Sequence, residues 1–335
     1  SSSVNLTAAN ATFDITGSTG NQTIQDLSGV ADSVVALGNR TLTAGSSNST
    51  TFSGVISDNG LGGALGGSFT KVGSGKLTLE GVNTYTGATT ISAGTLALAN
   101  DGSITHSSVV TVSSGATFDI TGIGGLDVAT IRNLAGSGSV LLGNKDLEIT
   151  HATGEFGGQI SGNAVGTLVV SGGTLTLTGV STYTSTTAIG RGATLALKGS
   201  GSIDNTNRIL FDPRGPAVGT FDISQTNSGA SVGGLEGDIG IVELGSKQLT
   251  ITSGTMGFPF VFGGVIKDGG IGGGTGGSLV IAENAAQVLT GENTYTGATT
   301  VGKNAYLALD DGGKIATSSS LNLTGDGAIF DIGCS

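Results

Sequence analysis

Residues Gly81–Leu98 read GVNTYTGATTISAGTLAL, and two close copies of this stretch recur in the chain of 335 residues. The second copy begins at Gly179 as GVSTYTSTTAI, and the third begins at Gly291 as GENTYTGATTV. Three of the four tyrosines of the chain lie in these copies. Either a binding site is used three times, or a folding unit is repeated three times.

The copies belong to a longer repeat of about 105 residues. Its clearest marker is a Phe-Asp-Ile segment, whose phenylalanines Phe13, Phe118, Phe221 and Phe330 are separated by 105, 103 and 109 residues. Other markers keep one order inside every period, such as LGNRTLT, LGNKDLEI and LGSKQLTI. The super-repeats are therefore approximately 13–117, 118–220 and 221–329. Because Ser1–Ile15 resembles Ser318–Ile332, we expect the chain to be a fragment of a longer repetitive protein.

The composition predicts many short strands and almost no helix. There are 63 glycines, 37% hydrophobic residues and only 11% charged residues, whereas disordered chains lack β-forming apolar residues. Val, Ile, Leu and Thr fill short alternating runs that Gly, Asn and Ser interrupt, as in strands joined by tight turns. Interspersed glycines would each cost about 1 kcal/mol inside a helix.

The charge and cysteine content exclude several classes of partner and site. A net charge of −11 repels phosphate backbones, so we expect no nucleic-acid partner. Cys334 is the only cysteine, so no disulfide within the chain is possible. The segment at residues 1–10 lacks the basic and apolar regions of a signal peptide, and any export signal is expected outside this sequence.

The spacing of the expected strands predicts a parallel β-helix. Short strands recur every 8–12 residues or so, which a sandwich or barrel would also show. Small aliphatic residues, an apparent coil of about 20 residues and insertions at fixed places (Asp212–Val218 and Gly257–Phe262) favour a solenoid. We expect one continuous β-helix over residues 1–335, with about 15 coils and a length of about 70–80 Å at roughly 4.8 Å per coil.

Residues Gly66–Leu98 resemble the passenger-associated transport repeat of bacterial autotransporters. The second copy departs from the pattern at Ser181 and Ser185, and the third departs at residues 286–288 and at Asn304. The matching positions of the first copy are Lys71, Gly73, Gly75, Leu77, Leu79, Gly81, Asn83, Thr84, Tyr85, Thr86, Gly87, Thr89, Ile91, Gly94 and Leu96.

The resemblance implies a right-handed β-helix that is exported through an outer-membrane β-barrel lying outside this sequence. It also implies display on, or release from, a Gram-negative surface. It implies no particular ligand, because proteins that share the repeat have diverse roles.

The repeated tyrosines Tyr85, Tyr183 and Tyr295 could stack on sugar rings. The alternative is a structural turn, opened by Asn or Ser, with Gly87 or Gly297 at positive φ and Thr hydroxyls bonded to the backbone. The copies would lie about 24 Å apart, five coils at roughly 4.8 Å each, which is too far for one ligand other than a polymer. We therefore favour packing or turn residues.

The aspartates of the Phe-Asp-Ile segments do not form a catalytic pair in this interpretation. They would lie about 24 Å apart, whereas glycosidase carboxylates lie about 5–9.5 Å apart. Because the flanking Phe and Ile share one face of a strand, each Asp should point to solvent. The four residues are Asp14, Asp119, Asp222 and Asp331. Arg40, Lys145 and Lys247 are expected on turns as solvated charges.

Other candidate motifs are also expected to be structural. His106 and His151 lack a second ligand at metal-binding spacing, and no G-x-S-x-G motif occurs. Val72–Leu79 looks like a phosphate loop but has Leu77 where Ser or Thr belongs. The glycine-rich segments Gly60–Gly67 and Gly270–Gly277 lack the Asp of calcium-binding repeats and should be flexible loops. No regular T-x-T array supports an ice-binding face around Thr89–Ser92.

We therefore expect no catalytic, cofactor-binding or metal-binding residues. The leading hypothesis is a non-enzymatic, extracellular passenger segment that acts as a rigid stalk or adhesin at a bacterial surface. Its partner would be a host surface protein or glycan, or another copy of the chain. Alternatives are a subunit of an extracellular fibre, a released virulence factor that binds a host receptor, and a polysaccharide lyase or hydrolase.

Overall fold

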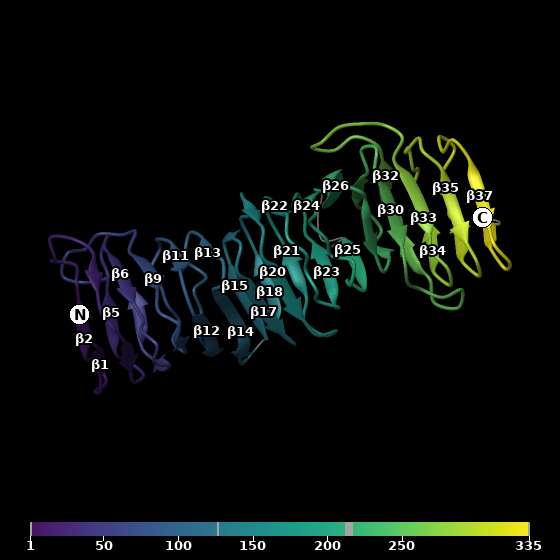
Figure 1. Ribbon diagram of the computed structural model, residues 1–335. Coiled ribbons are helices and arrows are strands. Elements are labelled where there is room, and N and C mark those ends of the chain that lie inside the picture. The colour runs from purple at the N-terminus through teal and green to yellow at the C-terminus, as the bar shows by residue number, and fades with distance from the viewer. Residues whose placement is uncertain (1, 126, 212–216, 334–335) are drawn as a thin grey trace. The chain divides into compact units, whose positions relative to one another are not determined.

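The computed structural model describes residues 2–125, 127–211 and 217–333, and all regular structure in them is β-strand (Figure 1). In these residues no helix is long and apolar enough to cross a membrane. The chain divides into two compact units, Ser1–Gly166 and Thr167–Ser335, which are described separately below. The single continuous β-helix over residues 1–335 stays a prediction. Cys334 and most of the insertion at 212–218 lie outside the described residues.

The described residues of the first unit form twenty short strands, and those of the second form eighteen. Those of the first unit are β1 (Val4–Leu6), β2 (Thr12–Asp14), β3 (Gln22–Thr23), β4 (Leu27–Gly29), β5 (Val34–Ala36), β6 (Thr41–Ala44), β7 (Thr50–Phe52), β8 (Val55–Ser57), β9 (Ser68–Lys71), β10 (Lys76–Leu79), β11 (Thr89–Ile91), β12 (Thr95–Asn100), β13 (Val110–Val112), β14 (Thr117–Ile123), β15 (Val128–Ile131), β16 (Leu134–Gly136), β17 (Ser139–Gly143), β18 (Asp146–Ile149), β19 (Glu155–Phe156) and β20 (Gln159–Gly162). Those of the second unit are β21 (Leu168–Val170), β22 (Thr174–Leu177), β23 (Thr186–Ile189), β24 (Thr194–Gly199), β25 (Arg208–Phe211), β26 (Thr220–Thr226), β27 (Ala230–Val232), β28 (Leu235–Glu236), β29 (Ile241–Glu243), β30 (Gln248–Ile251), β31 (Phe260–Phe262), β32 (Val265–Lys267), β33 (Ser278–Ile281), β34 (Ala286–Leu289), β35 (Thr299–Gly302), β36 (Tyr306–Leu309), β37 (Leu321–Thr324) and β38 (Ile329–Ile332).

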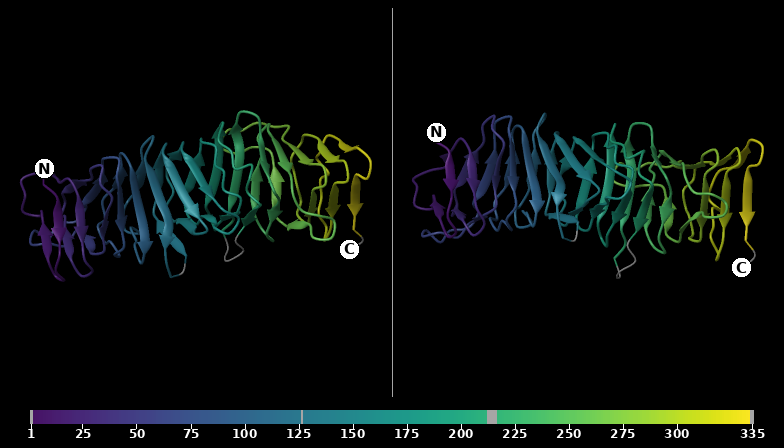
Figure 2. Two further views of the ribbon diagram at one scale, coloured as in Figure 1. Left: turned by 60° about the horizontal axis from the view of Figure 1, so that its bottom comes forward. Right: turned by 90° about the horizontal axis from the view of Figure 1, so that it is seen from below.

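Within each unit the strands wind into stacked coils, so that a strand pairs in parallel with its counterpart one coil later. The first unit contains the ladders β1-β4-β7-β10-β12-β14-β17-β20, β2-β5-β8 and β3-β6-β9-β11-β13-β16-β19, among others. The second contains β22-β24-β26-β29-β32, β21-β23-β25-β28, β27-β30-β33-β35-β37 and β31-β34-β36-β38. Figure 2 shows the strands of each unit side by side from two further directions. The described residues form a parallel β-solenoid of about 15 turns, which confirms the predicted fold class.

Equivalent inward-facing residues stack in register from one coil to the next. In the first unit one column runs Leu77, Leu96, Phe118, Val140 and Ile160, and all five side chains are buried. The second unit repeats the same residue types in the same order, at Leu175, Leu195, Phe221, Val242 and Ile266. Apolar surface that these columns remove from water stabilises the fold by about 25 cal/mol per Å². The short alternating runs of the sequence thus become the wall of a continuous apolar core.

The insertion at Gly257–Phe262 forms a tight turn followed by strand β31. Thr255 and Phe258 face each other in an antiparallel bridge, with the Phe258 amide donating to the Thr255 carbonyl over 2.9 Å. Phe258 is 88% exposed, so the turn presents an apolar side chain to solvent.

The Phe-Asp-Ile segments depart from the predicted alternation. Asp222 and Asp119 are buried, although strict alternation would point them to solvent. The pairing register shifts by one residue beside these segments, between Ala97 and Ala99 and between Ala196 and Lys198. Such a bulge bends the strand, and three successive residues then become covered. The prediction of solvent-directed aspartates is wrong for these two; Asp14 is half-buried, and only Asp331 is exposed.

The aspartate carboxylate holds a loop that belongs to a later coil. Asp222 accepts hydrogen bonds from the Ser224 amide (2.8 Å) and hydroxyl (2.6 Å), and from the Ile271 amide (2.7 Å). Asp14 makes the same contacts with Thr16 and with the Leu61 amide (3.1 Å), and the bonds to Thr16 are the main cause of its lowered pKa. The motif is therefore a clamp between coils.

We expect Asp222→Ala to lower the free energy of unfolding by about 1.5–3 kcal/mol, because three donors lose a charged acceptor. Asp331→Ala, in the exposed copy of the motif, should change it by less than about 0.5 kcal/mol. Urea denaturation followed by circular dichroism measures both. Equal effects of the two substitutions would contradict the clamp.

Candidate functional site

The three repeated tyrosines lie in the core and are not available to a ligand. Tyr85, Tyr183 and Tyr295 are each at most 1% exposed and lie between consecutive strands. The hypothesis that they are packing or turn residues is confirmed, and a sugar-stacking role is excluded. Burial raises the pKa of all three, that of Tyr295 to about 12.

Each tyrosine hydroxyl begins a buried relay of hydrogen bonds. The Tyr85 hydroxyl lies 2.5 Å from Thr89 Oγ1, which donates to Ser107 Oγ over 2.9 Å. Ser107 in turn donates to the Gly87 carbonyl over 3.0 Å. Each hydroxyl of the relay therefore donates to the next oxygen, from the tyrosine to the backbone carbonyl. The same relay occurs at Tyr183–Thr187–Thr206 and at Tyr295–Thr299–Ser318. The Tyr and the Thr four residues later thus form one buried polar unit.

The residue that opens the motif satisfies backbone groups of neighbouring coils. Asn83 Oδ1 accepts from the Ile56 amide (2.9 Å), and its Nδ2 donates to the carbonyls of Gly81 and Ser103. Asn293 makes the equivalent three bonds. Ser181 of the second copy is shorter, and its buried hydroxyl has no partner among the described residues.

Gly87 is required for space rather than for positive φ. Neither Gly87 nor Gly297 has a left-handed backbone, so that part of the turn prediction is wrong. A Cβ at Gly87 would lie 2.3 Å from Ser68 Oγ and 2.5 Å from the carbonyl oxygens of Gly66 and Gly67. The second copy accommodates Ser185 at this position, where its side chain is buried.

The basic position of the motif is a buried lysine. Lys71 is 1% exposed, and its Nζ donates to the carbonyls of Val72 (2.6 Å), Gly73 (2.9 Å) and Ala93 (3.3 Å). Burial lowers the pKa of this ammonium, and the charge of Asp26 partly opposes the effect. Val170 and Ile281 end the matching strands of the second unit, so Lys71 has a local packing role.

The phosphate-loop resemblance and the histidines provide no site. The second half of the segment Val72–Leu79 is strand β10 rather than the start of a helix, and Lys76 pairs with Asp119 over 3.2 Å. His106 and His151 are exposed, and the described residues contain no group of three or more metal-ligating side chains.

The three cations expected on turns differ in their surroundings. Arg40 and Lys247 follow turns and are half-buried. Lys145 is not a solvated charge, since its side chain is only 13% exposed and bonds to Asp127. Lys145 instead forms an ion pair within the first unit.

The glycine-rich segments are loops held by hydrogen bonds at both ends, and their flexibility stays a prediction. Asp14 and Thr16 bind the amides of Leu61 and Gly62, and Asp58 binds those of Gly66 and Gly67. In the second unit Asp222, Ser224 and Asp268 bind the corresponding amides of 270–277. These carboxylates thus act on the loops and are not free for calcium.

Outward-facing threonines of the first unit form a column one residue wide. Paired strands align Thr23, Thr43, Thr70, Thr90 and Thr111 in five successive coils. The residues two places earlier are mixed, namely Asn21, Thr41, Ser68, Ala88 and Val109. No T-x-T array results, in agreement with the sequence.

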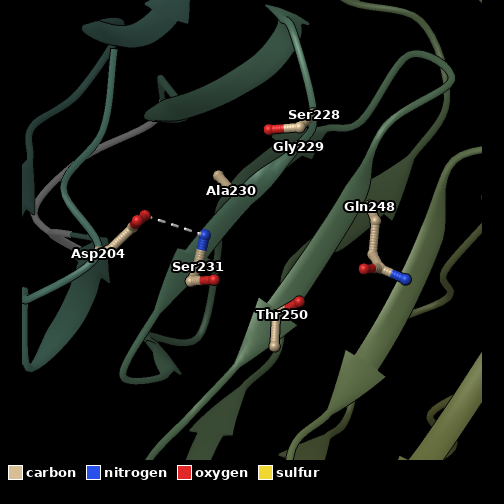
Figure 3. Close-up of a pocket in the computed structure, with 7 residues that line it drawn as sticks. All are labelled: Asp204, Ser228, Gly229, Ala230, Ser231, Gln248 and Thr250. Carbon is tan, nitrogen blue, oxygen red and sulfur yellow. Dashed lines mark hydrogen bonds between the residues drawn. The ribbon is translucent and has the colours of Figure 1, made fainter. Parts of the chain in front are cut away.

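The second unit carries a polar groove that the sequence did not predict (Figure 3). Two adjoining hollows of about 160 and 320 Å³ share Asp204, Ser228 and Gly229. Asp204 projects toward β27, where its Oδ1 lies 3.4 Å from the Ser231 amide, and Thr250 lies beside Ser231 on the paired strand β30. Further lining residues are Val180, Gly199, Ser200, Gly201, Ser202, Asn227, Ala230 and Gln248. Hydroxyl, amide and carboxylate groups in such a hollow can bind a polar molecule.

We expect Tyr85→Phe to lower the free energy of unfolding by about 1–2 kcal/mol, because the buried Thr89 oxygen loses its donor. Tyr183→Phe and Tyr295→Phe should have similar effects, whereas Tyr306→Phe on the surface should change stability by less than about 0.5 kcal/mol. Chemical denaturation of the four variants tests this. Four equal values would refute the relay.

The reciprocal exchange Gly87→Ser and Ser185→Gly tests the space requirement. Gly87→Ser forces a Cβ against three oxygens and should destabilise the chain by about 1–3 kcal/mol. Ser185→Gly removes a hydroxyl that has no partner and should cost less than about 1 kcal/mol. Thermal melting by differential scanning calorimetry distinguishes the two, and a larger loss for Ser185→Gly would overturn the assignment.

Comparison with known proteins agrees with this arrangement. Residues 69–98, 170–197 and 285–308 each match the family described as passenger-associated-transport-repeat. No curated protein and no solved structure matches the chain at a significant level. Each matching stretch contains one buried tyrosine and its Thr partner, together with the strands on either side. Three segments of the chain thus match the passenger-associated-transport-repeat, each on the same strand-turn-strand unit of a β-solenoid.

Proposed function

We propose that the chain is a non-enzymatic passenger segment of an autotransporter, which acts as a rigid stalk or adhesin at a Gram-negative cell surface. The observation that carries this proposal is the threefold match to a repeat named for passenger transport, located on a parallel solenoid. The repeat itself contributes to the core and leaves the outer surface for contacts.

The chemistry of the described residues supports a non-catalytic role. The repeated carboxylates Asp14 and Asp222 are engaged by loop amides and by neighbouring hydroxyls. The repeated tyrosines are buried, and the two histidines are exposed. Catalytic groups normally converge on a cleft with perturbed proton affinities. The mechanism we propose is geometric: stacked coils resist bending, and variable loops provide contacts.

Accessibility on intact cells tests the location. In the bacterium that produces the protein, proteinase K added outside should remove the chain from intact cells, as followed by immunoblotting. A periplasmic protein serves as the control that must survive. Protection of the chain until the outer membrane is permeabilised would contradict the proposal.

A second candidate is self-association into a fibre. The resemblance of Ser1–Ile15 to Ser318–Ile332 favours it. Analytical ultracentrifugation over a hundredfold concentration range should then show growing species, and a constant monomer would eliminate this candidate.

A further inference from the structure

We propose that the polar groove of the second unit, around Asp204, Ser228, Ser231 and Thr250, binds a neutral saccharide. This proposal names a class of ligand for the proposed adhesin. Only its biological role rests on the proposed function. Binding by the purified chain can be measured whatever its location in the cell.

The groove offers polar groups that the protein leaves unused. The side chains of Ser228, Ser231, Gln248 and Thr250 make no hydrogen bond to any described residue. Asp204 accepts a single long bond, 3.4 Å, from the Ser231 amide. Hydroxyls, an amide and a carboxylate on one hollow are the groups that pair with sugar hydroxyls, and ligand sites fix orientation through a few such convergent groups.

The corresponding place in the first unit shows the same framework with every group satisfied. Strand pairing and the aligned segments LGNKDLEI and LGSKQLTI match Asp127 to Ser228, Thr130 to Ser231 and Glu148 to Thr250. In the first unit Asp127 bonds to Lys145, and Glu148 Oε2 accepts from the Thr130 hydroxyl over 3.4 Å. The second unit has Ser228 and Thr250 in place of these two carboxylates. Ser231, which corresponds to Thr130, therefore has no carboxylate at these two positions to bond.

The position after Asp127 and Ser228 also differs between the units, and this difference opens the groove further. Val128 of the first unit is 41% exposed, and Gly229 replaces it in the second. A Cβ at Gly229 would lie 2.2 Å from the Gln248 carbonyl oxygen, so the backbone approaches strand β30 closely here. The hollow therefore follows from identifiable substitutions on a shared backbone pattern.

The charge at the groove favours an uncharged ligand. Asp204 supplies one carboxylate, and Lys247, which corresponds to the captured Lys145, reaches the Asn227 carbonyl at the rim over 3.5 Å. One charge of each sign leaves little net attraction for an anion or a cation, and the chain as a whole carries −11. None of the described residues that line the hollows is aromatic, so hydrogen bonds would dominate recognition.

The size of the hollows fits one or two sugar units. The smaller hollow, about 160 Å³, carries Ser231, Gln248 and Thr250, and the adjoining larger hollow, about 320 Å³, lies at the lower end of the roughly 300–1,000 Å³ of small-molecule sites. It suits a short segment of a glycan, held from one side.

The test uses the purified chain and saturation-transfer difference NMR with lactose, maltose, cellobiose and N-acetyllactosamine, and with sialyllactose as an anionic probe. At least one neutral disaccharide should receive saturation from the protein, and sialyllactose should receive less. The double substitution S228D and T250E restores the carboxylates of the first unit and should weaken binding at least about tenfold. Because the first unit already carries these carboxylates, the variant should retain the melting temperature.

A charge-matched control places two carboxylates on exposed positions of the first unit, N39D and S108D, and should bind as the unmodified chain does. Binding by the S228D and T250E variant equal to that of the control would overturn the assignment of the site. Absence of saturation transfer to every neutral disaccharide, or stronger transfer to sialyllactose, would overturn the class of ligand. Failure of the cell-surface test would leave these measurements unaffected.

Discussion

The structure depends on one constraint, the parallel pairing of each strand with its counterpart one coil later. This pairing places like positions directly above one another, so every inward residue must fit the residues of the coils on both sides. The columns from Leu77 to Ile160 and from Leu175 to Ile266 satisfy it with small aliphatic side chains and one Phe each. A bulky or unpaired polar side chain in such a column would disturb several coils at once.

Most polar groups that enter the core are satisfied by other groups, and the buried hydroxyls of Ser181 and Ser185 are exceptions. The tyrosine relay ends on a backbone carbonyl, Asn83 bonds three backbone groups, and the Lys71 ammonium is enclosed by carbonyl oxygens. A buried polar group that has lost its partners costs about 1–3 kcal/mol, so these residues must occur as sets. This explains why NTYTGATT recurs as a block, and why it marks the fold of the chain rather than a ligand.

The fold was predictable from the sequence because its signals are local and repeated. Short alternating runs, frequent glycines and the period between Phe13 and Phe118 together predict stacked strands, and the burial of Tyr85 follows from the same reasoning. The burial of Asp222 was not predictable, because it depends on an extra residue in its own strand β26 opposite Ala196–Lys198 and on a loop that lies 49 residues later in the chain. Likewise Gly87 looked like a turn glycine, whereas the carbonyls of a neighbouring coil set its requirement.

The groove was not predicted because its polar side chains lack hydrogen-bond partners. The sequence reveals that lack only when the repeats of the two units are aligned with each other. A signal was available: LGNKDLEI and LGSKQLTI differ by the loss of two carboxylates at Gln248 and Thr250.

Whether the repeated motif is structural is tested most directly by nitration of the native chain with tetranitromethane, followed by mass spectrometry of its peptides. We expect modification of Tyr306, with Tyr85, Tyr183 and Tyr295 protected until the chain unfolds. Equal nitration of all four tyrosines in the folded protein would contradict it.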